Sequence, residues 1–298
     1  GYLPLGAEEA GAPSMRTRTF LFAAGSVAAL VVFAAAARRF ADERRASRTW
    51  SELAALADPD PPRFDPAMAA NLPPPARRWF LRSLVPGTPL WRVAEIEMEG
   101  ELGLGDRAAL RYQPLRAREI LAPPHGFVWR PEVGRWPMRI AGSDGQAGDG
   151  AWTRFWLLGL VPIVRAADTP DLVRSAAARG VAEAALWLPT TLLPRHGVRW
   201  EPVDAQRTRA IVEHAGLRHE LDLEVADDGR LRTLRLMRWS NANREGVFRL
   251  QPFGGTVLEH GTVEGVTVAT RVEAGNFFGE EGYVPFFRVE LSRLRFLG

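Results

Sequence analysis

Glu183 is the acidic residue whose position could support chemistry. It lies at the edge of an apolar helical face, one turn before Trp187. A carboxyl group buried alone has a raised pKa and can act as a general acid. The competing interpretation is a structural carboxylate that bonds to the backbone or to Arg179, four residues earlier on the same helix. The sequence leaves both interpretations open.

His219 is the second candidate, because it is the polar side chain on the inward face of a strand at Leu217–Val225. It could be an acid–base partner for Glu183 or a hydrogen-bonded core residue. The other four histidines show no zinc spacing, and no phosphate-binding loop or Gly-x-Ser-x-Gly motif joins a strand to a helix. We therefore predict no metal and no cofactor.

Several large apolar side chains could line a ligand cavity. Aromatic rings suit acyl or isoprenoid chains, which gain about 25 cal/mol for each Å² removed from water. The alternative is that the ten tryptophans belong to the core. The candidate lining residues, the two polar candidates included, are Trp136, Trp152, Trp156, Val173, Ala177, Glu183, Trp187 and His219.

The composition excludes some classes of function. The chain of 298 residues has 38 basic residues, all arginine, against 35 acidic ones, and the net charge is +3. Without a clustered basic face, no nucleic-acid partner is expected. The absence of cysteine excludes disulfides and thiolate chemistry. Nothing in the composition identifies a protein partner.

The amino-terminal part contains an uncharged apolar run at residues 19–37. At ~1.5 Å per residue, this run can cross a hydrocarbon core of ~30 Å. A cleaved signal peptide ending near residues 34–37 is the alternative, but Arg38 and Arg39 disfavour cleavage there. We predict a single-pass membrane anchor at 19–37, an extension at 1–18, and a juxtamembrane helix with a linker at 38–67.

The side of the membrane stays open. The larger number of arginines after the anchor favours a cytoplasmic domain, whereas the short basic segment before it favours an extracytoplasmic one, toward which we lean.

Alternating polarity predicts half-buried strands in most of the remaining chain. In 135–141, for example, Trp136 and Met138 would face inward. A bulge is expected near Arg293, where the alternation changes phase, and Asp228-Gly229 suits a hairpin turn. The predicted strands are 94–101, 135–141, Leu217–Val225, 266–272 and 287–291.

A different segment interrupts these strands at residues 155–194. Residues 155–164 are apolar on both faces and are predicted to be buried on both sides. A helix follows, with Thr169 as its N-cap and Pro170 at its first position, and it ends before Pro189. A short amphipathic helix is also predicted at 76–84.

The run Glu183-Ala-Ala-Leu-Trp-Leu-Pro-Thr-Thr-Leu-Leu-Pro194 resembles a bacterial family of domains of unknown function. Similar patterns occur at residues 72–80, 126–129 and 283–296, so the resemblance covers about 70–298. In its order of elements this family looks like the LolA and LppX lipoprotein carriers. That likeness implies a half-barrel over a hydrophobic cavity.

We therefore predict an α+β domain at 68–298 that is mainly antiparallel β. Its curved sheet or half-barrel would have the mid-chain helical segment over its concave face, behind an amino-terminal transmembrane helix. The predicted function is a membrane-tethered, non-catalytic binding domain for a membrane lipid or another apolar small molecule. The alternatives are an enzyme that uses Glu183 with His219, and a non-catalytic interaction module at the membrane surface.

Overall fold

The computed structural model describes residues 15–105, 109–214 and 216–298, and the side chains of 15–25 and Ala28 are not among those described. Most of the predicted 1–18 extension therefore lies outside the described residues. The helices are α1 (Met15–Ala54), η1 (Pro66–Ala69), α2 (Pro74–Ser83), α3 (Pro170–Trp187), η3 (Pro189–Leu192) and η4 (Pro194–His196).

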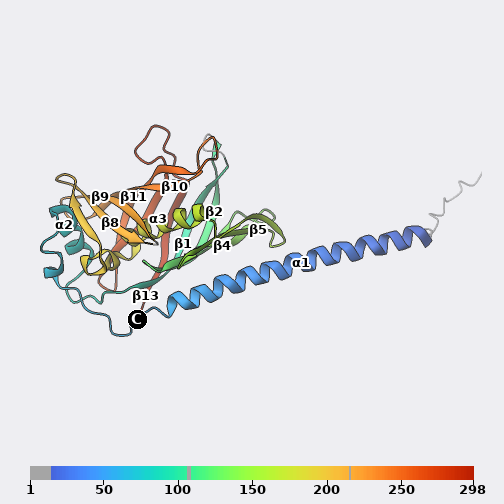
Figure 1. The fold of residues 1–298 in the computed structure, drawn as a ribbon, viewed down its shortest axis with the longest axis horizontal. Helices are drawn as coiled ribbons and strands as arrows, with labels where there is room; N and C mark the ends of the chain where they lie inside the picture. Colours follow the sequence, from blue (N-terminus) through green and yellow to red (C-terminus); the bar gives the residue numbers. More distant parts are fainter. Residues whose placement is uncertain (1–14, 106–108, 215) are drawn as a thin grey trace, which may run out of the picture.

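The described strands form one curved antiparallel sheet, which confirms the predicted class (Figure 1). Its first half contains β1 (Val93–Leu104), β2 (Arg111–Ala122), β3 (Gly126–Val133), β4 (Ile140–Ala147), β5 (Gly150–Leu157) and β6 (Val161–Ala167). Its second half contains β7 (Arg199–Pro202), β8 (Arg207–His214), β9 (Leu217–Val225), β10 (Leu231–Ser240), β11 (Arg249–Val263), β12 (Val266–Asn276) and β13 (Phe287–Leu297).

The order of the strands explains the place of α3. The chain runs outward from β1 to the edge strand β6, and after α3 it runs inward from the opposite edge strand β7 to β13, which pairs with β1. Helix α3 therefore connects the two edges of the sheet. It packs against β10 and also contacts β2, β3, β4, β5, β9 and β12, so it crosses one face. We call this the inner face.

The end of α1 packs on the opposite, outer face, against β2, β3 and β4 (Figure 1). Neighbouring residues of β3 show that the two helices lie on different sides, because side chains alternate along a strand. Val128 packs with Ala46 and Leu53 of α1, whereas the adjacent Phe127 lies under the guanidinium group of Arg179 on α3. The sheet therefore has a buried cluster on each face.

Small residues let α3 approach the sheet closely. Most of the helix from Ser175 to Trp187 is buried, and alanine is its most frequent residue. The Thr169 hydroxyl caps the first turn by accepting a hydrogen bond from the Leu172 amide at 3.3 Å. At the other end, the indole of Trp187 donates to the carbonyl of Ala269 on β12 at 3.1 Å. The predicted start and end of this helix are confirmed.

The local predictions were correct in the second half of the chain. The register between β1 and β13 shifts opposite Glu97 and Met98, so the bulge expected near Arg293 is present. Gly229 has a φ of 85° in the predicted turn between β9 and β10. The predicted strand at 135–141 was wrong, because β3 ends at Val133 and β4 begins only at Ile140. Pro137 offers no amide hydrogen to a strand ladder there.

The prediction that residues 155–164 are buried on both sides was also wrong. Phe155 belongs to β5, and a turn at Leu158 separates it from β6, whose residues are all exposed. Strand β6 is an edge of the sheet, and α3 does not cover it as it covers the centre. The run was apolar because Phe155, Ile163 and Val164 face the inner side of the sheet, whereas Trp156 is buried on the outer side.

Within the described side chains, no helix is long and apolar enough to cross a membrane. The side chains of 19–25 and Ala28 fall outside that set, so the anchor at 19–37 stays a prediction.

Candidate ligand cavity

A hollow of about 430 Å³ lies between α3 and the inner face of the sheet. Ligand sites in proteins have volumes of roughly 300–1,000 Å³ and are mostly apolar, with a few convergent polar groups. This cavity fits that description. Its apolar walls include Leu102, Leu104, Trp129, Val133, Ile140, Phe155, Ile163, Val164, Leu186, Trp187, Leu234, Phe253, Val272, Phe286 and Phe287, and its charged residues are Asp144, Arg179, Glu183, Arg238 and Glu273.

Arg179 is the centre of a buried ion cluster at the cavity wall. Its Nε donates to Oε1 of Glu183 at 2.6 Å, and one Nη donates to Asp144 Oδ2 at 2.8 Å. The other Nη is 3.5 Å from Oε1 of Glu119. The guanidinium group also lies 4.9 Å from the ring of Trp129. Burial of this cation is therefore compensated by carboxyl groups from α3, β4 and β2.

Glu119 is completely buried on β2. Burial raises the pKa of this carboxyl group well above its usual range, and the charge of Glu183 raises it further, while Arg179 acts in the opposite direction. A hydrogen bond between the Glu119 and Glu183 carboxyl groups favours the protonated form of Glu119. Glu119 does not line the cavity. It therefore belongs to the ion cluster around Arg179 but does not contact the space that a ligand would occupy.

Arg238 is the second arginine at the cavity wall. Its Nε is 3.2 Å from both the carbonyl and the hydroxyl oxygen of Ser175 on α3, and its guanidinium group lies 5.0 Å from the ring of Phe253. Burial, together with the charge of Arg179, lowers the pKa of Arg238 to about 10. Arg238 remains a cation at neutral pH.

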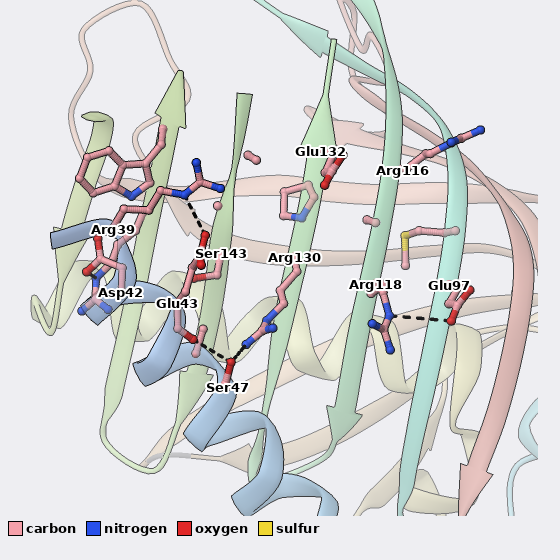
Figure 2. A pocket seen from close by; sticks show the side chains of 18 of the residues that line it. Arg39, Asp42, Glu43, Ser47, Glu97, Arg116, Arg118, Arg130, Glu132 and Ser143 are labelled. Atoms are coloured by element: carbon pink, nitrogen blue, oxygen red, sulfur yellow. Dashed lines mark hydrogen bonds and ion pairs between the residues drawn. The ribbon is translucent and has the colours of Figure 1, made fainter. Parts of the chain in front are cut away.

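A separate groove on the outer face is lined by side chains of both charges (Figure 2). Ser47 of α1 accepts a hydrogen bond from Arg130 at 2.8 Å, Asp42 pairs with Arg154 at 3.5 Å, and on the sheet Arg118 lies 3.8 Å from Glu97. These contacts join α1 to the sheet or neutralise charges on it. The groove is thus accounted for as the seam along which α1 packs.

Two of the residues predicted to line a ligand site lie at the wall of the inner-face cavity. Glu183 and Trp187 both reach the cavity from α3. The interpretation of Glu183 as a structural carboxylate named the backbone or Arg179 as its partner, and the structure shows Arg179. Trp187 is almost fully buried and is hydrogen-bonded to β12, so its ring is a fixed part of the cavity wall. Val173 and Ala177 pack on α3 outside the cavity.

The other three tryptophans lie elsewhere. Trp136 is 85% exposed in the turn between β3 and β4. Trp152 and Trp156 are buried on the outer face, where Trp152 packs in the cluster that includes Ala46 of α1 and Trp156 borders the groove of Figure 2. Phe155, which lies between them on the opposite face of β5, lines the cavity.

His219 is buried on β9, facing inward as predicted, but it does not line the cavity. Burial lowers the pKa of His219 to about 4, and the charges of His214 and Arg174 act in the same direction. Its Nε2 has no hydrogen-bond partner among the described residues. The structure therefore does not bring His219 and Glu183 to one cavity.

Sequence reasoning missed Glu119, Asp144, Trp129 and Arg238. Glu119 could have been identified from the pattern, because it lies on the same face of β2 as the apolar residues Leu115, Ala117 and Leu121. Arg238 had no such signal, since arginine occurs on most of the described strands. In the described part of the chain, no group of three or more His, Asp or Glu side chains could hold a metal ion.

The fold and the cavity define a class of antiparallel β domain with a helix laid across a hollow inner face. The chain belongs to a family of unknown function, DUF6544, which it matches over residues 62–289. That match agrees with the resemblance to a family of unknown function. No curated protein matches the chain.

Two solved structures are similar at low identity. A putative outer membrane lipoprotein-sorting protein domain from Vibrio parahaemolyticus is 13% identical, with a TM-score of 0.40 over 76% of this chain and 93% of that one. A DUF1329 family protein from Desulfovibrio piger is 10% identical, with a TM-score of 0.29 over 78% of this chain and 94% of that one.

Proposed function

We propose that the domain binds a lipid or comparable apolar ligand in the inner-face cavity, without catalysis, and that α1 holds it at a membrane. The observation that carries the proposal is the apolar hollow of about 430 Å³ under α3. Protein interiors are close-packed, with few voids larger than a water molecule. A hollow of this size, walled by aromatic and aliphatic side chains, is better suited to binding than to stability.

The rim of the cavity supports a membrane as the source of the ligand. Ile163 and Val164 of the edge strand β6 line the cavity and are also 44% and 42% exposed. In the adjoining turn, Leu158 and Leu160 are 49% and 43% exposed. The apolar surface therefore continues from the cavity over the open edge of the sheet.

That rim lies beside α1. A Cβ atom at Gly159, between β5 and β6, would overlap the guanidinium group of Arg39. Arg39 is the second residue after the uncharged run at 19–37, where an anchor would leave the hydrocarbon core. In Figure 1 the β5 end of the sheet lies on the side toward which α1 projects. An anchored α1 would thus hold the apolar rim near the lipid.

Catalysis by Glu183 with His219 is not part of the proposal. The Glu183 carboxylate is ion-paired with Arg179, and His219 lies outside the cavity. An acid–base pair must reach one substrate atom.

The test is ligand occupancy of the cavity. We expect mass spectrometry of protein purified without detergent to find a bound amphiphile, and a fluorescent fatty acid to bind the purified chain. Ala274→Trp places a bulky ring at the cavity wall and is expected to abolish probe binding, whereas Leu258→Phe, at an exposed position on β11, is the matched control. Absence of any amphiphile together with no probe binding would refute the proposal.

A further inference from the structure

We propose that the ligand of the cavity carries an acidic head group, which the guanidinium group of Arg238 binds with help from the indole N–H of Trp129. This inference rests on the proposed function and specifies its ligand as an anionic amphiphile. It comes from two polar groups on the cavity wall that the protein itself leaves without a partner of the matching kind.

Arg238 is a cation without a direct carboxylate partner. Among the described residues, no Asp or Glu oxygen lies within 4.0 Å of its nitrogens. Its Nε donates to the carbonyl and hydroxyl oxygens of Ser175. These bonds hold the side chain in place and leave the two terminal Nη groups available. Arg238 is partly buried, and charges withdrawn from water in proteins are normally paired, because desolvation otherwise disfavours them. The missing partner is therefore expected from a ligand.

Arg179, on the same wall of the cavity, differs from Arg238 in having carboxyl partners. All three nitrogens of Arg179 contact carboxyl groups, from Glu183, Asp144 and Glu119. These acids are thus engaged with Arg179, and two of them, Asp144 and Glu183, affect the pKa of Arg238 only from beyond ion-pair distance. Two arginines line one cavity, and only Arg179 has its counter-ions supplied by the chain.

Trp129 supplies the second observation. Its side chain lines the cavity, the residue is 7% exposed, and its Nε1 has no acceptor among the described residues. A buried indole N–H usually finds a hydrogen-bond partner. The ring itself is fixed by edge contacts with Phe155 and Phe287, at 6.5 and 6.3 Å between ring centres. An acceptor oxygen of a ligand would satisfy this donor.

These donors define the chemistry of the head group. Two Nη groups of one arginine form a planar fork that matches a carboxylate or a phosphate. The remaining walls are aliphatic and aromatic, so the rest of the ligand is an apolar chain. A free fatty acid and an anionic phospholipid share this chemistry, and the experiment has an arm for each.

The experiment is competition for a fluorescent fatty acid bound to the full-length chain in phosphatidylcholine nanodiscs. Oleate, oleyl alcohol and dioleoyl phosphatidate are added separately. We expect oleate, phosphatidate or both to displace the probe at a concentration at least ~10-fold lower than oleyl alcohol, since a charge-assisted hydrogen bond is lost with the alcohol. The acid that displaces better identifies the source.

Variants assign the preference to Arg238. Arg238→Gln is expected to weaken binding of the fatty-acid probe and to bring the three competitors to similar potency, and Arg238→Lys to retain part of the preference for the acids. Arg235→Gln, on the exposed face of the same strand, is the control. Trp129→Phe is expected to weaken displacement by the acids several-fold. It keeps a smaller aromatic ring at the wall and removes the N–H donor.

The possible outcomes separate this inference from the proposed function. Equal potency of acids and alcohol on the unmodified chain overturns the acidic head group, and a preference that survives in Arg238→Gln overturns the role of Arg238. Failure of all three competitors, with no probe bound, instead refutes the cavity as a lipid site. If Arg238→Gln does not fold, the unmodified chain and Arg238→Lys still decide the question.

Discussion

Arg179 and Glu183 lie one helical turn apart on α3, and the 2.6 Å contact between Nε and Oε1 joins them at the wall of the inner-face cavity. Exposed ion pairs at this spacing contribute little, whereas removing one partner of a buried pair leaves an uncompensated charge. The pair holds α3 in place, because Arg179 also reaches Asp144 on β4.

Replacing Arg179 is therefore expected to destabilise the domain strongly. We expect Arg179→Met to lower the free energy of unfolding by roughly 3–5 kcal/mol, because buried carboxyl groups lose their cation. Arg249→Met, which breaks an exposed pair with Glu245 at the same spacing, is the control and is expected to cost less than ~1 kcal/mol. Urea denaturation measures both, and similar losses would contradict a structural role for the cluster.

Glu119 predicts a pH dependence of stability. Its pKa is raised in the folded protein, so the folded state keeps a proton that the unfolded state loses above pH ~4.3. The free energy of unfolding therefore falls as the pH rises above that value, by at most ~1.4 kcal/mol per pH unit, until the folded pKa is reached. Glu119→Gln imitates the protonated form and removes this loss.

The measurement is urea denaturation at pH 5 and pH 8. The stability of Glu119→Gln relative to the unmodified chain is expected to increase between these values. Glu290→Gln, at an exposed position on β13, is the control and is expected to show no such change. A constant difference for Glu119→Gln would contradict the raised pKa.

For His219 we predict the opposite effect of pH on the free energy of unfolding, in a more acidic range. Its pKa is lowered to about 4 in the folded protein, against ~6.5 when unfolded, so the unfolded state binds more protons between these values. Stability is complete above pH ~6.5 and decreases as the pH falls toward 4, by on the order of 3 kcal/mol. We expect His219→Gln to remove this acid-side loss.

Nuclear magnetic resonance of the histidine ring protons follows the titration directly. The signal that disappears in His219→Gln is expected to titrate near pH 4 in the unmodified chain. Titration of that signal above pH 6 would contradict the burial of His219.

The sheet and α3 were predictable because their signals are local. Alternation of polar and apolar residues at Leu217–Val225 predicted β9, and Thr169 with Pro170 predicted the start of α3. The change of phase near Arg293 predicted a bulge that the register of β1 and β13 confirms. Each of these features depends on neighbours within a few residues.

The cavity was less predictable because its walls depend on which helix covers which face. The alternation at residues 150–157 separated Phe155 from Trp152 and Trp156 but could not show that α1 covers the second set. A strand whose two faces are both covered reads as apolar throughout. The partners of Arg179 come from three different elements. Only the contact with Glu183 could be predicted, because it joins residues four positions apart on one helix.

The tryptophans test this assignment of faces. Trp136→Ala is expected to change stability by no more than ~0.5 kcal/mol, because the side chain is 85% exposed. Trp152→Ala is expected to cost ~3–5 kcal/mol, since it empties the cluster under α1. Neither change is expected to alter binding of a fluorescent fatty acid in the folded protein, and a weaker affinity in Trp136→Ala would contradict the assignment.

The exposed rim between β5 and β6 yields a kinetic prediction. If the membrane supplies the ligand, Leu158 and Leu160 meet the lipid surface before the ligand passes β6. Leu158→Asp combined with Leu160→Asp is expected to slow transfer of a fluorescent fatty acid from vesicles to the full-length chain by roughly 10-fold, because two charges then oppose contact with the apolar layer.

The equilibrium affinity for the same probe is expected to stay unchanged, because neither leucine lines the cavity. Val203→Asp combined with Val247→Asp is the control, since these valines are 43% and 57% exposed at other places on the domain. An equal slowing by both double variants would show that charge alone, and not the rim, limits transfer. Unchanged transfer in the rim variant would remove β6 as the entrance.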